Sequence, residues 1–490
     1  MNNHPFYVII YSVGGCGSML VGSYILMFLT VIIVCMDYYY LFIMGTVSFY
    51  EFAYLLSHNM GTGGSITVVF DTIIACLLPF FISVLIFVLV DRFLLKNAKY
   101  KLIFSIIIFS ISLISLFKSV HLDEYVVNKS ENTDIFEKYY VDTNTVKVDL
   151  PNKKRNLILI YLESMEASLF SKENGGAFPE SIIPELELVA LNNTSFSNTN
   201  LLGGAYTLTS TSFTMSSITA STTGTPINIK LFDGYNKERP FMKTVKSLGN
   251  ILGDNGYNLE LIQGSSKEFG ALDLYALDNG NYKVFDDNTA REKGLVPKNY
   301  FEWWGIEDKK VLEFSKDEII ELSEKNEPFA VLLFTMDTHF KDGYLDKSCE
   351  AKYSEPLANA YACSSKMIND YLNWLKEQKF YDDTTIVLLG DHQVMQDSFY
   401  KNHKDYVRVN YNAFINSVDK HSIKNREFSQ YDMYPTILAS MGAKIEGNKL
   451  GFGVNLFSNE KTMIELLGRD KFNLELLKSS EYYDKYIFIK

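Results

Sequence analysis

The chain has 490 residues, of which 47% are hydrophobic and 14% aromatic, and its formal net charge is −12. This length predicts two or three structural units, and the acidic balance argues against a dedicated nucleic-acid-binding protein, which needs a basic surface. Residues 1–117 hold only four of the 46 basic and four of the 58 acidic side chains, so the whole net charge belongs to the remaining residues. This division excludes a fully soluble protein and a disordered one.

Three apolar segments in residues 1–117 are long enough, or nearly so, to cross a bilayer, and they cover 19–36, 67–90 and 102–117. The first is followed by an aromatic cluster of the kind found at membrane interfaces. It could extend back to Phe6, although we expect the glycine-rich run at 14–17 to interrupt it. We therefore predict a transmembrane anchor of about three helices over 1–117, with a fourth hidden in 6–17 as the alternative. No basic region precedes the first segment, which argues against a cleavable signal peptide.

The basic residues of the anchor predict its orientation. All four lie between the second and third segments, and cytoplasmic loops carry such an excess of Lys and Arg. The loop at 45–66 has none, so we expect it to face outside. The remainder of the chain then faces the periplasm or exterior, as part of a multi-pass protein of the cell (inner) membrane.

Cys349 and Cys363 are the only cysteines after residue 117, and they are close in sequence. In an oxidising compartment this arrangement predicts a disulfide that closes a short loop. Two unpaired buried thiols are the alternative.

The chain after the anchor falls into two parts. Residues 118–155 are polar and mixed in charge, which is typical of a linker or stalk. From residue 156 to 490, short apolar runs alternate with amphipathic stretches, and this pattern predicts an α/β domain with a mainly parallel sheet flanked by helices. We expect strands at 157–162, 259–262, 329–334 and 385–389, and helices that include 309–324 and 366–378.

Polar side chains follow several of these predicted strands, namely Glu163, Gln263, His339, Asp391 and His392. Ligands of open α/β sheets bind at the carboxyl ends of the strands. A single Asp-His pair is more often a turn residue beside a structural histidine, but carboxylates and imidazoles at one sheet edge are less easily explained in this way. The combination favours a divalent transition metal such as Mn²⁺ or Zn²⁺.

A Ser/Thr-rich stretch at 203–221 is followed by Gly224-Thr-Pro226. The plain interpretation is a polar loop that opens a helix of small residues. The functional interpretation is a hydroxyl nucleophile at a helix N-terminus, where free N–H groups and the helix dipole hold a phosphoryl oxygen.

The sequences Tyr161-Leu-Glu-Ser, Phe213-Thr214 with Gly224-Thr-Pro226, Met336-Asp-Thr-His-Phe340 and Gly390-Asp-His392 together resemble the alkaline phosphatase/sulfatase superfamily. Within it the chain is most similar to the bacterial phosphoglycerol transferase I family, membrane enzymes that decorate periplasmic glucans, and more distantly to lipoteichoic acid synthases. The resemblance covers roughly residues 156–457, including the loop at 341–344, the cysteine pair and the sequence at 432–437. It implies an alkaline phosphatase-like fold behind a membrane anchor.

The resemblance also implies one divalent metal, preferably Mn²⁺ with Mg²⁺ or Zn²⁺ as alternatives. Its implied ligands are Glu163, Thr214, Asp391 and His392, and Thr214 is the implied nucleophile. Thr214 is preferred because its spacing to Gly224-Thr-Pro226 matches the family. The competing hydroxyls are those of Thr207, Thr209 and Thr211.

Further positions are implied substrate contacts. His339 is expected on the substrate phosphate or in proton transfer. Gln263 falls where lipoteichoic acid synthases have a substrate-contacting histidine, and two of their later residues, a Trp and an Arg, are replaced by Gly270 and Leu272, so headgroup recognition can differ. Trp304 and Asp308 are candidates for headgroup contacts or for packing.

The implied activity is transfer of glycerophosphate from phosphatidylglycerol, a membrane phospholipid, to an extracytoplasmic glycan through a covalent phospho-threonine. A phosphoethanolamine transferase that uses phosphatidylethanolamine is the nearest alternative. A sulfatase is disfavoured because the Cys/Ser-x-Pro-x-Arg sequence that supplies formylglycine is absent. A non-catalytic membrane receptor on a hydrolase fold is the alternative of another class, and it predicts loss of ligands that this sequence keeps.

Overall fold

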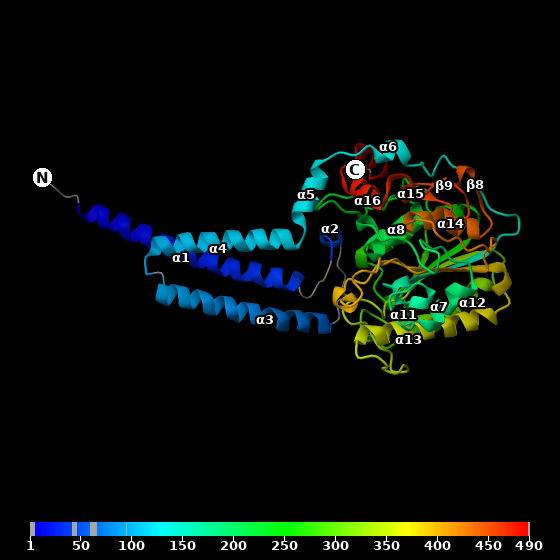
Figure 1. Ribbon diagram of the computed structural model, residues 1–490, viewed down its shortest axis with the longest axis horizontal. Coiled ribbons are helices and arrows are strands. Elements are labelled where there is room, and N and C mark those ends of the chain that lie inside the picture. Colours follow the sequence, from blue (N-terminus) through cyan, green and yellow to red (C-terminus); the bar gives the residue numbers. More distant parts are fainter. Residues whose placement is uncertain (1–4, 42–46, 59–65, 95, 489–490) are drawn as a thin grey trace. The chain divides into compact units, whose positions relative to one another are not determined.

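A computed structural model describes residues 5–41, 47–58, 66–94 and 96–488 (Figure 1). The chain divides into two compact units. The first consists of Met1–Phe49 and Ile66–Val126, and the second of Tyr50–Ser65 and Val127–Lys490. A short segment from the predicted 45–66 loop therefore belongs to the second unit.

The first unit is built from α1 (Pro5–Tyr39), α3 (Ile66–Leu89), which continues as a π-helical turn at Val90–Leu94, and α4 (Ala98–Ser119). Helix α1 runs without a break through the glycine-rich run at 14–17, so the predicted interruption is wrong, and residues 6–17 are part of α1 rather than a separate helix. Glycine is tolerated inside an apolar helix because each helix satisfies its own backbone hydrogen bonds.

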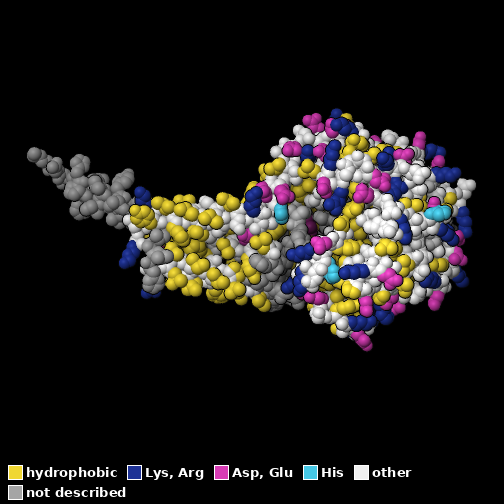
Figure 2. All heavy atoms as spheres, viewed as in Figure 1, with side chains coloured by type: hydrophobic (Ala, Val, Ile, Leu, Met, Phe, Trp, Pro, Cys, Tyr) yellow, Lys and Arg dark blue, Asp and Glu magenta, His cyan; other side chains and the backbone are white. Residues whose placement is uncertain are grey.

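Two helical stretches among the described residues, Ser18–Tyr39 and Ala98–Ser119, are long and apolar enough to cross a membrane. Both stretches expose large apolar side chains, which would be unfavourable in water. For example, Phe28 is 63% exposed and Ile114 is 62% exposed. Figure 2 shows hydrophobic side chains over the surface of these helices and charged ones over the second unit. The second predicted segment, 67–90, forms α3, which contains Pro79, and its crossing of a membrane stays a prediction.

The second unit, which the structure describes without gaps from residue 127 to 488, contains a six-stranded sheet of order β4-β3-β5-β2-β6-β7. Its neighbouring strands are parallel except for β7, which runs antiparallel to β6. The predicted mainly parallel α/β class is confirmed. The strands are β2 (Asn156–Leu162), β3 (Asn258–Ile262), β4 (Lys283–Phe285), β5 (Phe329–Phe334), β6 (Thr384–Gly390) and β7 (Asn412–Ile415).

Helices cover both faces of this sheet because successive residues of a buried strand point to opposite sides. Leu157, Leu159 and Tyr161 of β2 join one hydrophobic cluster, and Ile158 and Ile160 join the other. The first cluster includes side chains of α8 (Thr214–Thr223), α9 (Leu248–Asp254), α10 (Leu272–Asp278) and α14 (Met433–Ser440). The second includes side chains of α7 (Pro184–Asn192), α12 (Asp308–Ser323) and α13 (Pro356–Lys376). Figure 1 shows α8 and α14 on one side of the sheet and α7, α12 and α13 on the other.

Smaller elements complete the second unit. Two short antiparallel pairs join β1 to β8 and β9 to β10. Residues 118–155 contain two helices and β1, and Ile135 and Phe136 are buried in the first cluster. The remaining α-helices and strands are α2 (Phe49–Ser57), α5 (Leu122–Ser130), α6 (Ile135–Tyr139), α11 (Asp287–Glu292), α15 (Met463–Leu467), α16 (Arg469–Leu477), β1 (Val148–Asp149), β8 (Lys444–Ile445), β9 (Lys449–Leu450) and β10 (Gly453–Val454).

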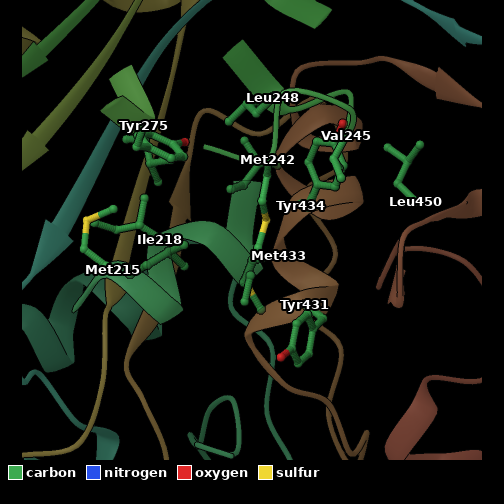
Figure 3. Packing of buried hydrophobic residues seen from close by; sticks show 14 of the residues in the cluster. Met215, Ile218, Met242, Val245, Leu248, Tyr275, Tyr431, Met433, Tyr434 and Leu450 are labelled. Carbon is green, nitrogen blue, oxygen red and sulfur yellow. The ribbon is translucent and has the colours of Figure 1, made fainter. Parts of the chain in front are cut away.

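Helix α8 lies deep in the first cluster, and every residue after its first is buried. Figure 3 shows Met215 and Ile218 of α8 among Tyr275 of α10 and Met433 of α14. A helix packed on all sides has little freedom to shift, so its first residue, Thr214, is held in place.

Candidate active site

Glu163, Asp391 and His392 come together at the carboxyl edge of the sheet. Strands β2 and β6 are adjacent, and Leu162 lies opposite Gly390. The residues that follow the two strands therefore lie at the same edge of the sheet. The potential ligand atoms of these three residues lie within 4.8 Å of one another, and all three side chains are buried. A Cβ added to Gly390 would lie 1.8 Å from the Met165 carbonyl oxygen, so only glycine fits directly before Asp391.

Local hydrogen bonds aim the imidazole and the carboxylate at the centre of this cluster. The Nδ1–H of His392 donates to the Gln393 carbonyl at 2.9 Å, which leaves Nε2 facing the carboxylates. His392 Nε2 lies 3.5 Å from Glu163 Oε1 and 3.4 Å from Asp391 Oδ2. Asp391 Oδ1 accepts the backbone N–H groups of Ser164 and His392, so Oδ2 is the atom turned toward the cluster.

The electrostatics of the cluster suit a bound cation. Burial raises the pKa of Asp391 to about 7, and the neighbouring Glu163 acts in the same direction. Burial alone would lower the pKa of His392, but Asp391 and Glu163 raise it to about 9. Two buried carboxylates this close repel each other, and a divalent cation would remove that cost. Two carboxylates, an imidazole and a hydroxyl form a donor set that fits Mn²⁺ or Zn²⁺.

The Thr214 hydroxyl is the fourth group at this place. Thr214 is the first residue of α8 and is partly exposed, and its Oγ1 lies 3.3 Å from His392 Nε2. The N-terminus of α8 adds unpaired backbone N–H groups and the positive end of the helix dipole, which together favour an anionic oxygen.

The competing hydroxyls have partners elsewhere. Each forms a hydrogen bond with a residue outside the cluster, and only Thr214 among the four is paired with His392. The partners are Asn410 Oδ1 for Thr207, Asn473 Nδ2 for Thr209 and the Leu208 carbonyl for Thr211.

His339 lies at the predicted edge but is not one of the three converging ligands. Its Nδ1–H donates to the Phe340 carbonyl at 2.7 Å, and its ring centroid is 4.5 Å from that of Trp304. Within the described residues, the buried Trp304 Nε1 has no hydrogen-bond partner. A donor left without a partner in a buried position is suited to an oxygen atom of a ligand.

Gln263 and Asp308 have different surroundings. Gln263 is buried at the end of β3, and its Nε2 lacks a partner among the residues that the structure describes. The Asp308 carboxylate accepts the backbone N–H groups of Met336 at 2.6 Å and Asp337 at 3.1 Å. Asp308 therefore fixes the segment that leads to His339.

Cys349 and Cys363 form a disulfide across 14 residues. Cys363 lies in α13, and Cys349 lies in the loop that precedes this helix. The bond ties the loop after His339 to a helix of the second cluster.

Two features near the site were missed in the sequence. Arg408 pairs with Glu166, which is fully buried four residues after β2. Their separation of 242 residues leaves no local signal. Glu51 is buried in α2, and its charge interacts with those of Glu163 and His392. In the sequence, Glu51 could have been singled out because it is the only acidic residue of the predicted outer loop at 45–66.

The chain is similar in sequence to known proteins. A family model described as Sulfatase matches residues 155–443. Phosphoglycerol transferase I of Escherichia coli is 26% identical over 360 residues, which is 72% of this chain and 42% of that protein. The chain thus spans less than half the length of the curated relatives it matches.

Solved structures with the same fold include a protein of the alkaline phosphatase superfamily from Vibrio parahaemolyticus. It has a TM-score of 0.50 and 20% identity, and the match covers 66% of this chain and 76% of that one. The lipoteichoic acid synthase LtaP from Listeria monocytogenes has a TM-score of 0.48 and 17% identity, with 64% and 79% covered.

Proposed function

Because the chain belongs to the sulfatase family, we propose that it is a metal-dependent phosphoglycerol transferase of the cell membrane. The proposed reaction moves glycerophosphate from phosphatidylglycerol to a hydroxyl of an extracytoplasmic glycan. The observation that carries the proposal is the position of the Thr214 hydroxyl, at the N-terminus of α8 and 3.3 Å from His392 Nε2 in a carboxylate and imidazole cluster.

Glu163, Thr214, Asp391 and His392 are the proposed ligands of one divalent metal, Mn²⁺ by preference. When bound, the metal lowers the pKa of a coordinated hydroxyl and neutralises charge on phosphoryl oxygens. The N-terminal N–H groups of α8 hold one of these oxygens in the same place.

The first proposed step forms a covalent intermediate on Thr214. Oγ1 attacks phosphorus and loses its proton, the bond from phosphorus to the diacylglycerol oxygen breaks, and diacylglycerol leaves with a proton. His339 is the proposed proton donor to the leaving oxygen, since it lies at the same sheet edge without being one of the converging ligands.

In the second step a glycan hydroxyl attacks the same phosphorus atom. The bond to Thr214 Oγ1 breaks, the threonine recovers its proton, and the glycan carries the glycerophosphate. A membrane-anchored enzyme suits this sequence because its donor is a lipid. The buried donors of Trp304 and Gln263 are proposed to contact the phosphoryl or headgroup oxygens.

The test is to incubate the full chain in mixed micelles with phosphatidylglycerol or phosphatidylethanolamine, without an acceptor. Released diacylglycerol is measured, and the adduct is located by peptide mass. We expect a glycerophosphate adduct on Thr214 that is absent from Thr214→Ala. Thr209→Ala, which removes a hydroxyl paired with Asn473, is expected to keep the adduct.

The other outcomes are informative. An adduct of ethanolamine phosphate alone would overturn the proposed donor. No adduct from either lipid, from a protein that binds metal, would overturn the two-step mechanism.

A further inference from the structure

Helix α8 is joined by hydrogen bonds to both strands whose ends carry the other proposed metal ligands. The Tyr161 hydroxyl of β2 lies 2.7 Å from Ser221 Oγ, and Ser221 Oγ donates its own proton to the Ser217 carbonyl at 2.8 Å. Because a hydroxyl carries one proton, Tyr161 is the donor in the first of these bonds. Ser217 Oγ donates to the carbonyl of Asp391, directly after β6. The series therefore runs from β2 through α8 to the end of β6.

The two serines lie on the face of α8 that carries Thr214. Residues three and four apart are neighbours on a helix surface, and Ser217 follows Thr214 by three positions and precedes Ser221 by four. Both serines are fully buried. Thr219 of the same helix differs from them, since its hydroxyl donates to the Met215 carbonyl within α8. The face that presents the proposed nucleophile is thus also the face attached to the strands.

Packing around α8 limits large movements, but placing a nucleophile needs finer control. Apolar burial is non-directional, whereas a hydrogen bond constrains both a distance and an angle between its atoms. A misplacement of about 1 Å can lower a reaction rate by about 100-fold. The bond from Ser217 to Asp391 lies one helical turn from Thr214, where a small rotation or slide of α8 would move the Thr214 hydroxyl.

The Asp391 carbonyl has two further donors that are independent of α8. Gln430 Nε2 donates to it at 2.8 Å and Asn410 Nδ2 at 3.0 Å, and both side chains are buried. A carbonyl oxygen has two lone pairs, so these donors satisfy it without Ser217. Removing the Ser217 hydroxyl therefore leaves no carbonyl unpaired at this place. What the change removes is the link between the ligand segment and α8.

We propose that Ser217 is a positioning residue that sets where the Thr214 hydroxyl lies relative to Asp391 and His392. It acts by joining the first turns of α8 to the backbone that carries both ligands, and Ser221 supports the same register from β2 through Tyr161. The consequence for catalysis rests on the proposed function. The consequence for metal binding requires no turnover and is tested separately.

The first test measures the Mn²⁺ affinity of the full chain for wild type, Thr214→Ala, Ser217→Ala and the double variant. Each single variant is expected to bind Mn²⁺ about 10-fold more weakly than wild type, at the lower end of the range for groups that orient metal ligands. The double variant is expected to match Thr214→Ala, because a hydroxyl that is absent cannot be misplaced. Multiplied effects in the double variant, or unchanged affinity in Ser217→Ala, would overturn the proposal.

The second test measures diacylglycerol release from phosphatidylglycerol in mixed micelles, without an acceptor and at saturating Mn²⁺. Ser217→Ala is expected to be about 10- to 100-fold slower than wild type even when its metal site is full. The matched control is Ser440→Ala in α14, a fully buried serine of the same cluster side whose hydroxyl donates to the Ile437 carbonyl of its own helix. It should keep the wild-type rate and Mn²⁺ affinity.

The outcomes separate this role from the proposed function. Equal losses in Ser217→Ala and Ser440→Ala would overturn the positioning role, since any buried serine would then matter to the same extent. A wild-type protein that binds Mn²⁺ but forms no adduct overturns the proposed function, and the Mn²⁺ affinities then decide the role of Ser217 alone. A wild-type protein that binds no Mn²⁺ overturns both. If Ser217→Ala fails to fold, Ser217→Cys, which weakens the donor, takes its place.

Discussion

Arg408 binds the fully buried carboxylate of Glu166 through two of its nitrogens, and the same side chain donates to the Val394 carbonyl at 2.8 Å. The N–H of Val394 in turn donates to Glu166 Oε1 at 3.1 Å. This closed set of bonds holds the loop that begins at His392. The ion pair is therefore a positioning device for the imidazole.

Arg408→Lys is expected to keep the charge but lose the planar fork, so the loop after His392 is held less firmly. We predict metal affinity about 10- to 100-fold weaker than wild type, the range for groups that orient ligands. Metal titration of the full chain measures it. Arg469→Lys, at an exposed pair with Asp470, is the control and should bind like wild type. Equal affinity in both variants would contradict the positioning role.

Asp391→Ala is predicted to abolish stoichiometric metal binding, because it removes one of the three buried groups whose ligand atoms lie within 4.8 Å of one another. Purified wild type should carry about one divalent ion per chain by elemental analysis. Added Mn²⁺ at about 100 times Kd should stabilise wild type by about 2.7 kcal/mol and leave the variant unchanged. The exposed Asp470→Asn is the matched control. A wild-type protein that binds no metal would favour the non-catalytic receptor.

The buried carboxyl group of Asp432 is expected to make the stability of the folded protein depend on pH. Burial raises its pKa from 3.8 to about 7, although the N–H groups of Ser429 and Val454 and the nearby Arg426 act in the opposite direction. Between about pH 4 and pH 7 the unfolded chain has lost this proton while the folded chain keeps it. The contribution to stability is thus full below pH 4 and is lost as pH rises through 7.

The measurement for Asp432 is the Tm of the metal-free protein across this pH range. We expect Asp432→Asn to have a lower Tm, since it loses an acceptor for a backbone N–H, and a shallower fall with pH because its side chain does not titrate. Asp470→Asn should retain the wild-type slope. An identical slope in all three proteins would refute the assignment.

The Cys349–Cys363 disulfide is predicted to contribute about 3 kcal/mol to stability, as expected for a loop of this length. The double variant Cys349→Ser with Cys363→Ser should show a Tm lower than wild type by several degrees. Reductant should lower the Tm of wild type and leave the double variant unaffected. Equal response of both proteins to reductant would show that the bond is not responsible.

The central fold was accessible from sequence because four of its strands are long, apolar and buried on both faces. Strands β4 and β7 were not predicted, since Lys283–Phe285 and Asn412–Ile415 are too short to show a pattern. The convergence of Glu163, Asp391 and His392 followed from strand ends meeting at one sheet edge.

Other parts of the site depend on contacts that no local pattern contains. The bond between Arg408 and Glu166 spans 242 residues, and the bond between Tyr54 and Gly270 spans 216. The pattern of apolar residues that predicts a strand indicates only which positions are buried. It does not identify the distant side chains that contact those positions. Glu51 could be seen as the only acidic residue of the predicted outer loop, but its burial within α2 could not be predicted.

The placement of α2 has a consequence for biosynthesis. Tyr54 of this helix is translated 216 residues before Gly270, whose carbonyl accepts the hydrogen bond from the Tyr54 hydroxyl. Because chains emerge from the ribosome N-terminus first, this helix cannot make its contact with Gly270 until β2 and β3 have been translated. Joining such distant segments is entropically slow, so completion of the catalytic unit is expected among the late events of folding. A nascent chain that stops before residue 270 would carry the helix but could never bury it.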